Sequence, residues 1–234
     1  MKYTIISIDD SRKEYKDIIR HTLEGHEEVY INCLDARPPE VDIEKELLRL
    51  GLSVAPRWVH MPPKRGDFGG FVGHFNAWRK CVELDEPLIV FEDDAIIGDG
   101  LKTFFGYEKS YDFVSLCVND YGKQFYGQHV DFDELGYHQN HYDLSTDEQS
   151  VFYIDGKIAK VYQPWTLTAA IYTPVSARYL IDKVRSAGLY MNADAFVMHQ
   201  ARLQKFSAIA PVPDIADNIV KFNEGYSLIQ GAVE

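Results

Sequence analysis

The stretch at residues 87–95 constrains the fold of this chain more than any other, because an apolar run leads directly into three acidic residues. Residues 88–91 have the length and the β-forming composition of a strand that is buried on both faces of a sheet. Glu92, Asp93 and Asp94 follow at its carboxyl end, the edge at which open α/β sheets bind ligands. The sequence therefore predicts either a solvated acidic turn or a site for a divalent cation and a phosphate-bearing substrate.

Length, charge and cysteine content narrow the class of protein. The chain has 234 residues, enough for a full core, and a net charge of -12 without a basic block, which disfavours a broad nucleic-acid surface. Cys33, Cys81 and Cys117 lack metal-ligand spacing and predict free thiols in a reducing compartment. The sequence shows no signal peptide and no membrane-spanning stretch, so we expect a cytoplasmic protein that could work at the surface of the inner membrane.

Strands and helices alternate along the chain, as in nucleotide-binding α/β domains. A strand at residues 3–8 precedes a helix at 12–23 whose first turn contains Arg12 and Lys13. Cations fit poorly there, and we expect both to be solvated, with an anionic ligand as the alternative. Further strands are expected at 28–33, 111–118, 151–154, 158–162, 166–173 and 206–211, and further helices at 43–50, 66–84, 99–105 and 174–184 and after Asp194.

A glycine-rich run precedes the acidic strand. Four glycines at the start of one helix would each cost about 1 kcal/mol relative to alanine, so they indicate close packing or close approach of a ligand. His74 and Trp78 share one face of this helix at i, i+4 spacing. On its own, His74 is best explained as a core histidine with satisfied hydrogen bonds.

Three pieces of the chain together resemble glycosyltransferase family 25, the lipopolysaccharide and lipooligosaccharide sugar transferases, which are related to collagen galactosyltransferases. The pieces are the run Gly66-Asp67-x-Gly69-Gly70-x-x-Gly73-His74-x-x-x-Trp78, the apolar strand, and Glu92-Asp93-Asp94. The family pattern is roughly Gly-Glu-x-Gly/Ala-Cys-x-x-Ser-His-x-x-x-Trp, so Asp67, Gly70 and Gly73 depart from it. The run at 167–180 and Asp194 also resemble the family, and the resemblance extends over residues 3–211.

The resemblance implies a GT-A-like α/β fold with a mixed, mostly parallel central sheet flanked by helices. It implies an inverting hexosyltransferase that moves galactose or glucose from a UDP-sugar or another nucleotide-sugar donor to an oligosaccharide or glycolipid acceptor, with Mn²⁺ or Mg²⁺. We expect one domain over residues 1–234. Its donor-binding half is expected at 3–120, its acceptor-binding half at 121–211 and a tail without a recognisable motif at 212–234.

The resemblance also implies roles for individual residues. Asp94 is the first candidate metal ligand, with Glu92 and Asp93 beside it, and strand alternation predicts Glu92 and Asp94 on one side. Asp194 is the candidate catalytic base, with a helix N-cap as the alternative. The donor-binding candidates are Gly66, Asp67, Gly69, His74 and Arg12.

Residues 121–150 are polar, aromatic and without clear periodicity. Aromatic faces combined with hydrogen-bonding groups suit sugars, so Tyr126, Tyr137 and Trp165 are the candidate acceptor-binding residues. The alternative is a surface excursion with incidental histidines.

Three other functions remain open from the sequence. A metal-dependent phosphohydrolase could combine the acidic triplet with Asp120, Asp155 and His199, but it would not explain the glycine-rich helix. A non-catalytic carbohydrate-binding relative is compatible with the departures from the family pattern. Transfer of sugar to a hydroxylated base in DNA, as in some phage enzymes, is disfavoured by the acidic charge.

Overall fold

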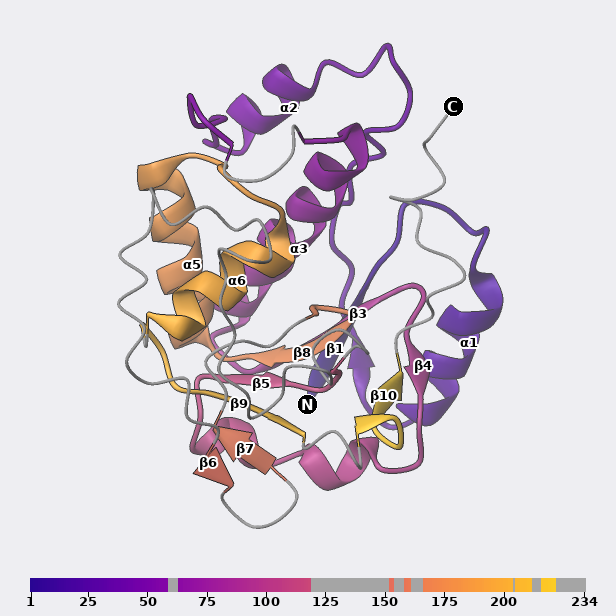
Figure 1. Ribbon diagram of the computed structural model, residues 1–234. Coiled ribbons are helices and arrows are strands. Elements are labelled where there is room, and N and C mark those ends of the chain that lie inside the picture. Colours follow the sequence, from indigo (N-terminus) through magenta and orange to yellow (C-terminus); the bar gives the residue numbers. More distant parts are fainter. Residues whose placement is uncertain are drawn as a thin grey trace, which may run out of the picture.

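The computed structural model describes residues 1–58, 63–118, 152–153, 158–160, 166–203, 205–211 and 216–221. Their strands form one eight-stranded sheet and one two-stranded sheet. In spatial order the large sheet contains β2 (Glu27–Glu28), β1 (Lys2–Ile6), β3 (Leu88–Glu92), β8 (Ala169–Tyr172), β5 (Phe113–Ser115), β9 (Ala208–Pro211), β7 (Ile158–Lys160) and β6 (Phe152–Tyr153) (Figure 1).

Most strands of the large sheet run in one direction. β1 is parallel to β2 and β3, and β5 is parallel to β9. β8 is antiparallel to β3 and β5, and β7 is antiparallel to β9 and β6. Six of the eight strands described in this sheet therefore share a direction, and β7 and β8 run the opposite way. This confirms the predicted mixed, mostly parallel α/β sheet and is consistent with a GT-A-like fold.

Helices cover both faces of this sheet. On one face lie α3 (Arg65–Leu84), α5 (Pro174–Ala187) and α6 (Ala193–Arg202), and on the other lies α1 (Lys13–Thr22) (Figure 1). Leu88 and Val90 of β3 belong to the core cluster beneath the first three helices, whereas Ile89 and Phe91 belong to the cluster that includes α1. The central strand is thus buried on both faces, as its sequence predicts.

Local sequence signals account for several helix ends. The short helix α2 (Ile43–Arg49) is preceded by its N-cap residue Asp42, whose Oδ1 accepts a hydrogen bond from the Lys45 amide at 3.0 Å. Gly51, just after α2, has a φ of 71°, which is the left-handed region that favours glycine. α5 begins at Pro174, in the first helical position that proline prefers.

Some elements are shorter than the sequence predicts. β2 covers Glu27–Glu28 instead of 28–33, and β5 covers Phe113–Ser115 instead of 111–118. The region predicted as a helix at 99–105 contains a 3₁₀ turn, η1 (Leu101–Phe104), and a second one, η2 (Tyr107–Lys109), follows it. The strands predicted at 151–154 and 158–162 are found as β6 and β7, which pair antiparallel, and the residues between them lie outside the described part of the chain.

The region after residue 211, for which the sequence predicts no element, contributes to the fold. β10 (Val220–Lys221) pairs antiparallel with β4 (Ile96–Ile97), which follows the acidic triplet directly. The amide of Gly100 donates to the carbonyl oxygen of Asn218 at 2.7 Å. A Cβ on Gly100 would lie 2.7 Å from the same oxygen, so this pairing requires glycine.

Two glycines in α3 allow the backbone of this helix to pack closely against the sheet and against a loop. A Cβ on Gly73 would lie 2.5 Å from Cγ2 of Ile6 in β1, and one on Gly69 would lie 2.8 Å from the carbonyl oxygen of Leu34. Gly70 differs, because no atom would lie within 4 Å of its added Cβ. Close packing therefore explains Gly69 and Gly73 but not Gly70.

We expect Gly73→Ala to lower the free energy of unfolding by about 1–3 kcal/mol, because the added methyl group forces Ile6 to move within a packed core. Gly70→Ala is the matched control in the same helix. It is expected to be neutral or to stabilise by about 0.5–1 kcal/mol. Urea unfolding of the three proteins measures both effects, and equal behaviour of the two variants would contradict the packing explanation.

Among the described residues, no helix combines the length and the apolar composition needed to cross a membrane.

Candidate active site

A cavity of about 250 Å³ lies at the carboxyl ends of β1 and β3, where α3 and α6 begin. Nine of the predicted site residues line it: Arg12, Gly66, Asp67, Gly69, His74, Glu92, Asp93, Asp94 and Asp194. The structure therefore brings together residues from four separate parts of the sequence. The predicted acceptor-binding residues Tyr126, Tyr137 and Trp165 lie outside the described residues.

Arg12 is buried against two of the three acids, so the expectation that it is solvated is wrong. Its side chain is 7% exposed, and its Nη1 lies 2.9 Å from Oδ1 of Asp93 and 3.1 Å from Oδ2 of Asp94. Lys13 next to it is exposed, as predicted. The guanidinium thus supplies the counter-charge that neighbouring buried carboxylates need.

The acidic triplet does not continue the strand. β3 ends at Glu92, and Asp93 and Asp94 lie in a turn in which the Ala95 amide donates to the Glu92 carbonyl at 3.1 Å. The predicted alternation, with Asp93 opposite Asp94, is therefore wrong, since both carboxylates contact Arg12. The second carboxylate oxygen of Asp94, Oδ1, is buried and has no hydrogen-bond partner among the described residues.

Glu92 lies in a second cluster with His74 and Asp194. Nε2 of His74 is 3.1 Å from Oε1 of Glu92, and one potential ligand atom from each of the three residues lies within 4.8 Å of the others. The His74 side chain is 1% exposed, and this burial lowers its pKa to about 4. The imidazole is therefore neutral near pH 7, and it donates from Nε2 when Glu92 is ionised.

Burial changes the acidity of the cavity carboxylates. Desolvation is the main reason that the pKa of Asp194 is raised to about 7, and the nearby Glu92 carboxylate adds to it. Desolvation likewise raises the pKa of Glu92 and that of Asp94, each to about 7, although Arg12 opposes the rise in both. These acids can hold or release a proton close to neutral pH, as groups in catalytic sites often do.

The structure distinguishes Asp194 from a helix cap. The N-cap of α6 is Asn192, whose Oδ1 accepts a hydrogen bond from the Ala195 amide at 3.0 Å. The alternative interpretation of Asp194 is therefore wrong, because its carboxylate lies in the first turn of α6. Asp67, in contrast to Asp194, does cap a helix. Its Oδ2 accepts a hydrogen bond from the Lys64 amide at 2.7 Å at the start of α3.

A loop that the sequence analysis did not single out forms another wall of the cavity. Residues 34–37 line it, and Nη2 of Arg37 lies 2.9 Å from Oδ2 of Asp9. Arg65, the first residue of α3, donates to the carbonyl oxygens of Ala36, Pro38 and Val41 at 2.6, 2.8 and 2.6 Å. No periodicity marks this loop, and only the clustering of Asp and Arg in the sequence could have indicated it.

A cavity at the carboxyl edge of a mostly parallel sheet is the place where open α/β proteins bind their ligands, and this cavity is lined by several acidic side chains. The family model for glycosyltransferase family 25, described as LPS biosynthesis protein, matches residues 1–197, and the chain belongs to this family. It is also 32% identical over 66 residues to the lipooligosaccharide biosynthesis protein lic2B of Haemophilus influenzae. That match covers 28% of this chain and 25% of the relative.

Proposed function

We propose that this protein transfers a hexose, galactose or glucose, from a nucleotide sugar to a saccharide hydroxyl with inversion at the anomeric carbon. The observation that carries the proposal is the convergence of Glu92, Asp94 and Asp194 in one cavity. Family membership supports the reaction class. The name of the Haemophilus relative supports a lipooligosaccharide or a similar glycolipid as acceptor, and such an acceptor would require work near a membrane surface.

The donor set fits a divalent cation. Oδ2 of Asp94 contacts Arg12, its buried Oδ1 has no hydrogen-bond partner among the described residues, and Glu92 lines the same cavity. We propose that Asp94 and Glu92 would hold Mn²⁺ or Mg²⁺, with Asp93 held by Arg12 beside them, because such ions prefer one or two carboxylates plus phosphate oxygens. When bound, the ion would neutralise charge on the leaving diphosphate as a Lewis acid.

The nucleotide diphosphate is proposed to bind where α3 begins. Gly66 and Gly69 line the cavity there, so the backbone can approach a ligand closely. The amino-terminal end of a helix also carries partial positive charge, which favours phosphate groups. A UDP-sugar is the proposed donor.

Asp194 is the proposed general base. It would accept the proton of the acceptor hydroxyl while that oxygen bonds to the anomeric carbon and the bond from this carbon to the diphosphate oxygen breaks. A base with a pKa of about 7 is well matched to this role at neutral pH. His74 is proposed to orient Glu92 through its Nε2 contact, beside the donor contact that the family resemblance implies for it.

The test is a titration of the purified protein with a panel of nucleotide sugars in the presence of Mn²⁺. A bound donor is expected to raise the melting temperature by mass action, and Asp94→Asn is expected to abolish that rise. Lys13→Gln, at an exposed position close in sequence to Arg12, serves as the control and should respond like the wild type. If no nucleotide sugar stabilises the wild type, the proposed donor site is wrong.

A further inference from the structure

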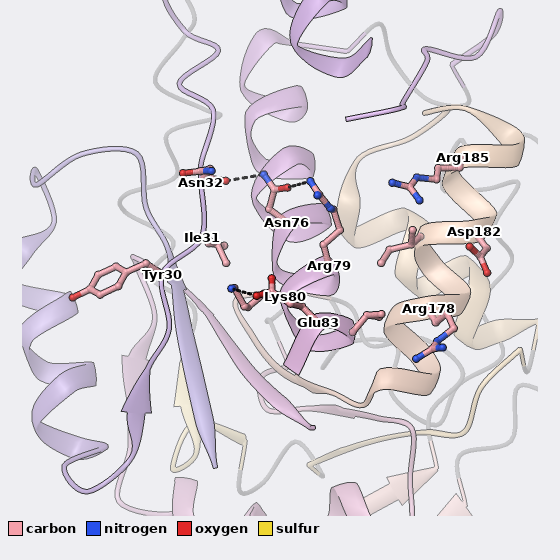
Figure 2. A pocket seen from close by; sticks show the side chains of 12 residues that line it. Tyr30, Ile31, Asn32, Asn76, Arg79, Lys80, Glu83, Arg178, Asp182 and Arg185 are labelled. Atoms are coloured by element: carbon pink, nitrogen blue, oxygen red, sulfur yellow. Dashed lines mark hydrogen bonds and ion pairs between the residues drawn. The ribbon is translucent and has the colours of Figure 1, made fainter. Parts of the chain in front are cut away.

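A second cavity lies between α3 and α5 (Figure 2). It has a volume of about 610 Å³ and shares no lining residue with the acidic cavity. It is lined by the second half of α3, by residues 178–185 of α5 and by residues 30–32. We call it the α3–α5 groove.

The charge of the groove is opposite to that of the chain. Its lining contains four basic and two acidic side chains, a formal charge of +2, whereas the whole chain carries -12. Lys80 and Glu83 largely neutralise each other, because Nζ of Lys80 lies 3.0 Å from Oε1 of Glu83. In Figure 2 the carboxylate of Asp182 points to the side of α5 away from α3. The remaining positive charge belongs to arginines.

Two of these arginines, Arg79 of α3 and Arg185 of α5, extend into the space between the helices (Figure 2). Neither has a carboxylate of the described residues within ion-pair distance. Among the described residues, the hydrogen-bond partner of Arg79 is the amide oxygen of Asn76, 3.4 Å from Nη1, and Asn76 in turn donates to the Asn32 carbonyl at 2.8 Å. Cζ of Arg185 lies 5.7 Å from the centre of the Phe75 ring.

This arrangement differs from that of three other arginines among the described residues. Arg20, Arg37 and Arg49 each contact a carboxylate at 3.2 Å or less. In the groove, neutral groups hold the two guanidinium groups instead, so their remaining N–H donors are available for a ligand. A planar guanidinium matches the oxygens of a phosphate with two parallel hydrogen bonds.

We propose that the α3–α5 groove binds a phosphate group, with Arg79 and Arg185 approaching it from opposite sides. Arg178 lies at one end, where Asp85 at 4.0 Å offsets part of its charge. The partly apolar floor, formed by Ile31, Val82 and Ile181, would contact the organic part of the ligand. The phosphate could belong to a free phosphomonoester or to a lipid headgroup. The proposal does not depend on the transferase activity.

The test measures binding of two probes, phenyl phosphate by calorimetry and vesicles of phosphatidic acid in phosphatidylcholine by sedimentation. The double variant R79Q/R185Q is expected to weaken binding about tenfold or more, because charge-assisted hydrogen bonds are lost. K45Q/R49Q is the matched control, since it removes two exposed positive charges from α2. Asp94→Asn should leave binding unchanged, which separates the groove from the acidic cavity.

Binding of phenyl phosphate alone would identify a soluble ligand, and binding of vesicles would identify a headgroup. Either result supports the groove as long as R79Q/R185Q loses it and K45Q/R49Q retains it. The proposal would be overturned if the wild type bound neither probe, or if R79Q/R185Q and K45Q/R49Q lost binding to the same extent. R79K/R185K keeps the positive charges but removes the planar guanidinium groups, so it is expected to bind with intermediate affinity.

Discussion

Asp194→Asn is expected to reduce the rate of sugar transfer by a factor of about 10²–10⁴, because an amide cannot accept the proton of the attacking hydroxyl. The substitution keeps the size of the side chain. It should also leave α6 intact, since Asn192 and not Asp194 caps this helix. The melting temperature of the variant should therefore stay close to that of the wild type, which separates lost chemistry from lost folding.

The pH dependence of the rate provides an independent check on the same residue. Burial raises the pKa of Asp194 to about 7, and only its ionised form can accept a proton. The wild-type kcat/KM is expected to rise as the pH increases through this pKa and then to level off. The residual activity of Asp194→Asn should lack the rise, and a variant that keeps both the rise and more than about a tenth of the rate would exclude Asp194 as the base.

Arg12→Gln is expected to destabilise the protein by about 3–5 kcal/mol, because it leaves two buried carboxylates without their counter-charge. Asp93 is 6% exposed and Asp94 is 5% exposed, so water screens their repulsion poorly. Urea unfolding at neutral pH measures the effect. Lys13→Gln, which removes an exposed charge one position later, should change the free energy of unfolding by less than about 0.5 kcal/mol.

The cause of the Arg12→Gln effect can be separated from general loss of packing. A second substitution, Asp93→Asn, removes one of the two unpaired charges and should recover part of the lost stability. Mn²⁺ should stabilise Arg12→Gln more than it stabilises the wild type, because it can replace the missing positive charge. If neither change restores stability, the ion pair is not the source of the destabilisation.

The sequence predicts the elements around the site better than the contacts within it. β3 and α3 are found because their apolar patterns are strong, and the carboxyl edge of β3 follows from the fold class. The pairing of Arg12 with Asp93 could not be predicted, because 81 positions separate them and helix α1 alone suggests a solvated cation. Long-range contacts of this kind depend on tertiary packing.

The end of β3 and the N-cap of α6 could also not be predicted from the sequence pattern. Alternation predicts opposite sides for Asp93 and Asp94, but the strand ends at Glu92, two residues earlier than that argument requires. Asn192 and Asp194 are both good N-cap residues, and only the backbone geometry of the α6 start decides between them. In each case the error is one or two residues, yet it changes the chemical role assigned to a carboxylate.

The pairing of β4 with β10 joins two parts of the chain that leave the ribosome at very different times. The backbone that follows Glu92, Asp93 and Asp94 finds its partners at Asn218 to Lys221, roughly 120 positions later, a long-range contact of the kind that slows folding. The ribosome releases the strand that carries the acids long before it releases those partners. Until β10 emerges, β4 of the nascent chain would therefore lack this partner, whereas β1 and β3 could already pair.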